Sequence, residues 1–303
     1  MGIIFNNAAL LVRAKLNHVK FDEILTIGHQ DQYLSQSQIV RLAKFCGLTH
    51  DITGLSSQKH IDKFFTLFLD AKNVSSIDYS EYEGCTIIHD MNQPVDPKYY
   101  EKYDVVIDGG SLEHIFNFPV AVSNCMNMVK PGGSIFIFTM CNNHAGHGFY
   151  QFSPELFFRI FQPENGFKIC DVIVEKHPYP GAELSPRTKC YSVTDPVVVR
   201  GRVGLKSRTP VMMMVHAKRT AVKPLFVASP IQSDYQSEYN KFTESSEQSA
   251  NAKKSMRDVA KKIYKSLPLR VQYFLRGNYQ RKSFSFSNRR FYKRWYPLKP
   301  ISK

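Results

Sequence analysis

The sequence predicts an α/β protein: a seven-stranded, mostly parallel sheet with helices on both faces, followed by a basic helical C-terminal tail. Short apolar runs alternate with longer mixed segments of helical periodicity, which is the pattern of βαβ units. Several of these runs end at Asp or Gly. After residue 219 the composition changes, and Lys and Arg dominate.

Seven apolar runs are predicted as strands. In chain order they cover residues 24–27, 74–77, 85–88, 103–107, 134–140, 167–174 and 210–216. We expect helices at 35–46, around 64–69, at 117–129, and from Ser153-Pro154-Glu155 onward, where a proline occupies the first turn. The stretch 177–209 is rich in Pro, Gly and Arg and is too long for an ordinary connection, so it is predicted to be a substrate-side excursion.

Positive charge is concentrated at the C-terminal end. The net charge is +14, but residues 1–219 hold 22 Lys/Arg against 21 Asp/Glu, whereas residues 220–303 hold 18 against 5. We therefore expect an α/β domain over 1–219, a Ser/Gln/Glu-rich linker over 220–251, and a basic, aromatic-rich helical tail over 252–303.

The tail allows three interpretations. Its basic helix and interleaved aromatic residues suit an anionic membrane surface, and the same composition suits a nucleic-acid backbone. Packing on its own domain or on a second chain is the third. No apolar run approaches the ~18 residues needed to cross a bilayer. The six cysteines are scattered without a CxxC pair, so reduced thiols and a cytoplasmic compartment are expected. Because no nucleic-acid motif is recognisable, the membrane interpretation of the tail is favoured over the nucleic-acid one, and it would make the protein peripheral on the inner face of the membrane.

Polar residues and glycines follow the predicted strands. Gly28-His29-Gln30 comes after the first strand, Asp78 and Asp90 after the next two, and Asp108-Gly109-Gly110 after the fourth. In open parallel sheets, ligands bind in the crevice outside the carboxyl ends of the strands. The sequence therefore predicts a ligand site at this edge, although each acid could also be a solvated turn residue.

Two segments carry a resemblance to a known family. Residues 103–114 (YDVVIDGGSLEH) resemble the strand-four motif of class I S-adenosylmethionine-dependent methyltransferases, which commonly ends in Leu-Glu-His. Residues 129–134 (VKPGGS) are similar to the signature before strand five. The resemblance covers residues 22–219 and implies a Rossmann-like fold, S-adenosyl-L-methionine as cofactor, and methyl transfer to oxygen or nitrogen of a small or glycan-type acceptor.

The resemblance also implies site residues. The implied cofactor contacts are Gly28, Gln30, Asp78 on the ribose hydroxyls, Asp90 and Met91 near the adenine, and Asp108, Gly109 and Ser111. Residues 146–157 (GHGFYQFSPELF) are similar to a segment of methyltransferase-like proteins, some of them associated with surface-polysaccharide synthesis.

On the acceptor side, His114, His147 and Tyr150 are expected as acid/base or positioning groups, because a neutral imidazole can take a proton from a hydroxyl. Substrate contacts are expected from His144, Gln151, Arg200 and Arg202, since guanidinium groups bind carboxylates and phosphates. Structural roles remain open for all of them. A metal site at Cys141, His144 and His147 is an alternative, but no fourth ligand is evident, so no metal is predicted.

The loop after the first strand departs from the family pattern, acid-x-Gly-x-Gly-x-Gly. Thr26 takes the place of the acid, Gly28 remains, and Gln30 and Gln32 replace the second and third glycines. Glycines allow a close approach of backbone to ligand. Either Gln30 and Asp31 contact the cofactor differently, or cofactor binding is weakened or lost. In the second case the chain would be a non-catalytic adaptor acting through its tail.

Overall fold

The computed structural model describes residues 2–199, 201–235 and 262–299. The chain divides into two units. The first comprises Met1–Val193, Arg208–Pro230 and Arg294–Lys303, and the second comprises Thr194–Ser207 and Ile231–Lys293. The predicted boundary between linker and tail, at residues 251 and 252, falls outside the described part.

A nine-stranded sheet runs in the order β11-β9-β8-β10-β7-β6-β2-β4-β5. The strands are β2 (Glu23–Ile27), β4 (Asn73–Asp78), β5 (Ile87–Ile88), β6 (Tyr103–Asp108), β7 (Val129–Asn142), β8 (Phe167–Lys176), β9 (Lys189–Val193), β10 (Val211–Arg219) and β11 (Tyr292–Trp295). A separate parallel pair joins β1 (Gly2–Ile3) to β3 (Asp31–Gln32).

The predicted count of seven strands is wrong, although each of the seven predicted runs overlaps an observed strand. The two additional strands, β9 and β11, continue the sheet beyond β8. Both are short, and half or more of their residues are not buried. Such strands at the end of a sheet need no continuous apolar run, so the search for apolar runs missed them.

The chain adds strands first on one side of β2 and then on the other. From β2 it passes outward to β4 and β5, then returns to β6 on the other side of β2 and continues to β7. Strands β2, β4, β5, β6 and β7 pair in parallel, and β10 is antiparallel to both β7 and β8. This topology confirms a mostly parallel α/β core and places a topological switch point between β2 and β6.

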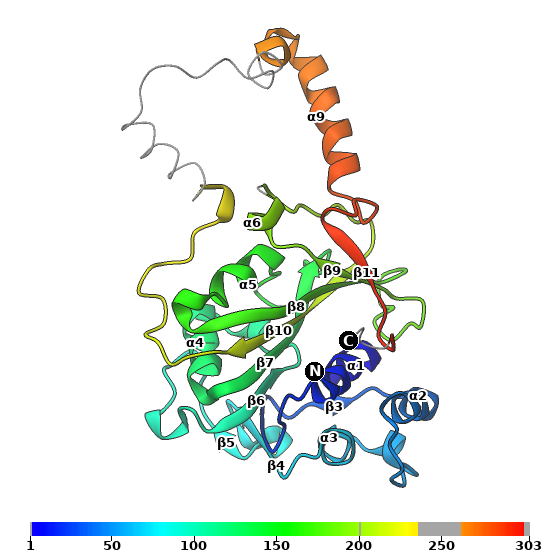
Figure 1. Ribbon diagram of the computed structural model, residues 1–303, viewed down its shortest axis with the longest axis vertical. Helices are drawn as coiled ribbons and strands as arrows, with labels where there is room; N and C mark the ends of the chain where they lie inside the picture. Colours follow the sequence, from blue (N-terminus) through cyan, green and yellow to red (C-terminus); the bar gives the residue numbers. More distant parts are fainter. Residues whose placement is uncertain (1, 200, 236–261, 300–303) are drawn as a thin grey trace. The chain divides into compact units, whose positions relative to one another are not determined.

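Helices cover both faces of the sheet in the first unit (Figure 1). On one face lie α1 (Phe5–Leu16), α2 (Gln36–Cys46) and α3 (Asp62–Leu69), and on the other lie α4 (Phe118–Met128) and α5 (Pro154–Ile160). The start of α2 shows why the sequence folds this way. Ser35 caps it reciprocally with Gln38, and Gly47 ends it with a φ of 70°.

Short 3-10 turns connect these elements: η1 (Leu55–Ser57), η2 (Glu81–Glu83), η3 (Pro97–Tyr99), η4 (Leu112–His114) and η5 (Pro163–Asn165). The core of the first unit joins apolar residues of α1, α2 and α3 to the central strands. It also includes Trp295 of β11, which is 7% exposed. The Arg13 guanidinium lies over the Trp295 ring, 5.4 Å from its centroid.

The second unit contains α6 (Pro196–Val199) and α9 (Leu269–Ser283). The Phe284 ring packs against Gly204, and the Lys206 amide donates to the Phe284 carbonyl at 2.8 Å. Helix α9 leaves Tyr273, Phe274 and Tyr279 at least 66% exposed. In the ranges that the structure describes, no helix has the length and apolar character to cross a membrane.

Candidate functional site

A cavity of about 290 Å³ lies at the carboxyl ends of β2, β4, β5 and β6, at the switch point. Seven residues that the sequence singled out line it: Gly28, Gln30, Asp78, Asp90, Met91, Ser111 and His114. These residues come from four separate chain segments, so the fold gathers them as the strand order predicts. The remaining lining residues, which the sequence analysis missed, are Ile27, His29, Ile77, Tyr79, Glu83, His89, Asn92 and Ile115.

The loop at Gly28 is held tightly against its neighbours. Gly28 has a φ of +73°, and its amide donates to the Ile77 carbonyl at 2.8 Å. A Cβ at this position would lie 3.3 Å from Ser111 Oγ and 3.9 Å from Asp78 Oδ2. Ser111 Oγ in turn donates to the Ile27 carbonyl at 2.7 Å. The backbone angle therefore favours glycine here, and a Cβ would have little spare room.

Gln30 braces this loop from within. Its side chain is 1% exposed, and its Nε2 donates to the carbonyls of Ile27 and Gly28 at 2.6 and 3.2 Å. A Cβ on Gly109 would lie 1.9 Å from Gln30 Oε1, so the amide occupies space that only a glycine at 109 leaves open. Gln32 Nε2 likewise donates to the Leu55 carbonyl at 2.6 Å. The two glutamines are thus tied to the protein's own carbonyls, and the cavity stays open beside Gln30.

Asp78 presents a carboxylate beside the Gly28 loop. Its Oδ1 accepts the Tyr79 amide at 2.6 Å, and its carbonyl accepts the His89 amide at 2.8 Å. Asp78 is partly exposed and lines the cavity. An ionised carboxylate has about four acceptor positions, so Asp78 can still receive hydrogen bonds from a ligand with adjacent hydroxyls.

Asp90 and Met91 form the neighbouring wall. The Asn92 amide and its side-chain Nδ2 donate to Asp90 Oδ1 at 2.9 and 2.8 Å, which lowers the pKa of Asp90. Met91 is 5% exposed. An apolar thioether next to acceptor groups suits the flat face and polar edge of a heteroaromatic ring.

Asp108 and Gly109 lie behind the cavity wall, not among its lining residues. Asp108 is 1% exposed, and its Oδ1 accepts the amides of Ser111 and Leu112 at 2.8 and 3.3 Å. Burial, and then the nearby Glu113 carboxylate, hold the pKa of Asp108 well above its usual range. Asp108 therefore shapes the turn that carries Ser111 and η4.

His29 ties the first loop to α3 and η2. One ring nitrogen lies 2.7 Å from the Glu83 carbonyl and the other 2.8 Å from Asp62 Oδ2, and the ring stacks on His60 at 3.7 Å between centroids. Burial disfavours the imidazolium, but these two hydrogen bonds raise the pKa of His29 overall. Its place directly after a strand end was the signal available in the sequence.

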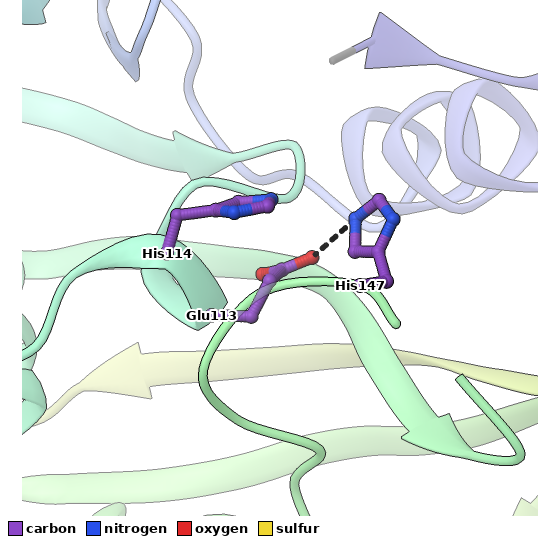
Figure 2. A group of neighbouring side chains, drawn as sticks. All are labelled: Glu113, His114 and His147. Carbon is purple, nitrogen blue, oxygen red and sulfur yellow. Dashed lines mark ion pairs between the residues drawn. The ribbon is translucent and has the colours of Figure 1, made fainter. Parts of the chain in front are cut away.

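A second cluster adjoins the cavity (Figure 2). The side chains of Glu113, His114 and His147 point toward one another, and one potential ligand atom from each lies within 4.8 Å of the others. Glu113 Oε1 is 3.8 Å from His147 Nε2, and the two imidazole centroids are 5.0 Å apart. Because His114 also lines the cavity, the cluster stands at the cavity's edge.

Glu113 is the residue that the sequence analysis overlooked in this cluster. It is 0% exposed, and Thr139 Oγ1 donates to its Oε2 at 2.9 Å. Across the described ranges no hydrogen bond reaches its Oε1. Burial raises the pKa of Glu113, whereas burial and the neighbouring His147 lower the pKa of His114.

The other residues expected on the acceptor side form hydrogen bonds or ion pairs within the protein. Tyr150 Oη donates to the Phe116 carbonyl at 2.6 Å. Gln151 Oε1 accepts the His144 amide at 2.7 Å, which closes the loop that carries His147. Arg202 belongs to the second unit, where its Nε lies 2.5 Å from Asp234 Oδ2.

Two further residues, Arg200 and His144, were expected to contact the substrate. Arg200 lies outside the described residues. Burial lowers the pKa of His144, as expected for an imidazole held neutral in a loop. Cys141, the third member of the alternative metal site, is absent from the one group of potential metal ligands found in the described ranges.

No protein-family model and no curated protein sequence matches this chain. Solved structures similar to it include the 1,6-didemethyltoxoflavin-N1-methyltransferase of Burkholderia thailandensis with bound S-adenosylhomocysteine, at 13% identity over 72% of this chain and 78% of that chain, with a TM-score of 0.38. Another is the branched-chain polyamine synthase of Thermus thermophilus with 5′-methylthioadenosine, at 11% identity over 75% of this chain and 61% of that chain, with a TM-score of 0.33. Similarity at this level leaves the function to be inferred from the cavity itself.

Proposed function

We propose that this chain transfers a methyl group from S-adenosyl-L-methionine to oxygen or nitrogen of a small acceptor. The observation that carries the proposal is the cavity at the switch point, where the Asp78 carboxylate faces the Gly28 loop. Ligands of open α/β sheets bind in this crevice. The motif at 103–114 ends in this crevice, where its residues Ser111 and His114 line the cavity beyond the end of β6.

The lining residues fit the parts of this cofactor. Asp78 would accept both ribose hydroxyls, and Met91 with Asp90 would hold the adenine. The Gly28 loop lines the cavity without a side chain of its own, and it would contact the methionine portion. The cofactor supplies a methyl group on a positively charged sulfur.

The acceptor side would lie at His114 and the neighbouring His147. Methyl transfer depends mainly on alignment of the attacking atom with the methyl carbon and the sulfur. A hydroxyl acceptor must also lose a proton, and His114, with its lowered pKa, is neutral near pH 7 and can receive it. A glycan-type acceptor remains part of this proposal, since the polar loop around His144 offers hydrogen-bonding groups.

The position of Gln30 favours an enzyme over a cofactor-free adaptor. The adaptor hypothesis requires Gln30 and Gln32 to fill the space where a cofactor binds. Both amides instead donate to backbone carbonyls, and the cavity that Gln30 lines keeps a volume of about 290 Å³.

A membrane role for the second unit is proposed in addition. Helix α9 exposes Tyr273, Phe274 and Tyr279 and carries four basic residues, so it can place aromatic rings and positive charge at an anionic surface. Co-sedimentation with anionic vesicles should fall several-fold in a Tyr273→Ser/Phe274→Ser variant. Equal sedimentation of both proteins would contradict this role.

The proposed cofactor site is tested by calorimetric titration with S-adenosylhomocysteine. Asp78→Ala removes two charge-assisted hydrogen bonds and should weaken binding by roughly 10–100-fold. Asp51→Ala, which changes an exposed aspartate outside the cavity, is the matched control. Equal affinity of the Asp78→Ala variant and the wild type would overturn the assignment, as would an equal loss in the control.

A further inference from the structure

We propose that Glu113, His114 and His147 bind a divalent transition-metal ion. Each contributes one ligand atom, and the three atoms lie within 4.8 Å of one another. Two imidazoles and one carboxylate form a donor set that suits Zn²⁺ and its neighbours in the first transition row.

The buried carboxylate is the strongest indication of a ligand. Glu113 is 0% exposed, and its Oε1 points toward the two imidazoles without a hydrogen bond from any described residue (Figure 2). A buried carboxylate oxygen without a partner is costly. His147 Nε2, 3.8 Å away, also lacks a hydrogen-bond partner among the residues that the structure describes. A cation between the two atoms would satisfy both.

The separations require only small side-chain movements. Ligand atoms about 2.0–2.1 Å from a tetrahedral ion are about 3.3 Å apart. Glu113 Oε1 and His147 Nε2 are 3.8 Å apart, and no pair exceeds 4.8 Å. Rotations about the side-chain bonds of His114, which is exposed, and His147, which is partly exposed, can close this difference.

The surrounding structure holds the ligands in place. Thr139 Oγ1 fixes the second oxygen of Glu113 at 2.9 Å, the kind of support that orients metal ligands. The amides of Phe149 and Tyr150 donate to the Glu113 carbonyl at 2.8 and 3.2 Å, so the loop bearing His147 is attached to the same residue. A Cβ on Gly148 would lie 2.7 Å from that carbonyl oxygen, so glycine permits this close approach.

Three protein ligands leave a coordination position open toward the cavity, because His114 belongs to both the cluster and the cavity wall. The use of the ion in catalysis rests on the proposed function. An acceptor hydroxyl bound to the ion would have a lowered pKa and lose its proton to solvent. Its oxygen would then form the new C–O bond as the C–S bond breaks and the sulfur keeps the electron pair. With the ion bound, both imidazoles act as ligands.

The test is a titration of the full chain, purified without a histidine tag and treated with chelator, with Co²⁺ followed by visible absorption and with Zn²⁺ followed by calorimetry. We expect one equivalent to bind. Glu113→Gln and His147→Ala should each weaken binding by at least about 10-fold. His50→Ala, which removes an exposed histidine outside the cluster, should leave it unchanged.

Absence of stoichiometric binding would overturn the metal site, and so would affinity that survives in both variants. His147 is partly exposed, so its variant tests the site even if Glu113→Gln does not fold. S-adenosylhomocysteine binding by the metal-free chain is measured in parallel. If the chain binds S-adenosylhomocysteine but no metal, the metal site is wrong and the cofactor site is retained. If it binds metal but no S-adenosylhomocysteine, the cofactor site is wrong and the metal site is retained.

Discussion

Glu175 on β8 is a buried acid whose ionisation should control stability. Its side chain is 0% exposed, and burial raises its pKa from the ordinary 4.5 to about 7, although Asn6 and Cys190 donate hydrogen bonds to it. Between these two pH values the unfolded chain has lost the Glu175 proton and the folded chain has kept it. Folding is therefore disfavoured increasingly as the pH rises through this window.

The size of the effect follows from the pKa difference. One pKa unit corresponds to about 1.4 kcal/mol, so this group removes on the order of 3 kcal/mol of unfolding free energy between pH 4.5 and pH 7. Glu175→Gln keeps the shape and the acceptor oxygen but cannot ionise. The variant should gain stability relative to the wild type as the pH rises, and the difference should level off above pH 7.

The assay is urea unfolding of both proteins at intervals from pH 5 to pH 8. Glu164→Gln, which changes an exposed glutamate, serves as control and should run parallel to the wild type. Parallel profiles for Glu175→Gln and the wild type would refute the argument, because the buried carboxyl would then ionise as easily as it does in the unfolded chain.

Three further predictions concern the cavity and its loops. Gly109→Ala should lower the free energy of unfolding by about 1–3 kcal/mol, because the new methyl group displaces the Gln30 amide. In a double-mutant cycle, much of this loss should vanish once Gln30→Ala is present. Additive losses of the two substitutions would contradict the contact. Asp108→Asn should keep the fold, because the amide oxygen can still accept hydrogen bonds from the amides of Ser111 and Leu112, whereas Asp108→Ala should lower the free energy of unfolding by about 1–3 kcal/mol. Thermal denaturation measures the difference between the two variants. Equal stability of both would contradict the role of Asp108 in holding this turn. Tyr150→Phe removes a hydrogen bond to the Phe116 carbonyl and should cost about 1 kcal/mol without changing cofactor affinity. A large affinity loss in calorimetry would contradict this by making Tyr150 a cofactor contact.

The sequence predicts the sheet core well because its strands are buried on both faces. The runs that became β2, β6 and β7 are nearly continuous in apolar residues, so they stand out without reference to any partner. The polar residues that follow them become a site once the strand order is known. Asp78 could therefore be assigned to this crevice from its position at a strand end, whereas Ser111 was assigned through the family resemblance.

The parts that the sequence did not predict depend on contacts between distant segments. Half or fewer of the residues in the outer strands β9 and β11 are buried, and these strands are defined by the strands they pair with. Gln30 stands where the family pattern has a glycine. Its amide occupies the space beside Gly109, a contact that no local sequence pattern reveals. Glu113 lies in the segment 103–114, which resembles the strand-four motif. Its burial beside His147, 34 positions later, appears only in the folded chain.

The central claim is that the switch-point cavity holds S-adenosylmethionine with its ribose on Asp78. The most direct test is a crystal structure of the chain with S-adenosylhomocysteine. We expect the ribose hydroxyls within hydrogen-bond distance of the Asp78 carboxylate, the adenine against Met91, and the sulfur near His114. A ligand bound elsewhere, or an empty cavity at saturating ligand, would contradict the account.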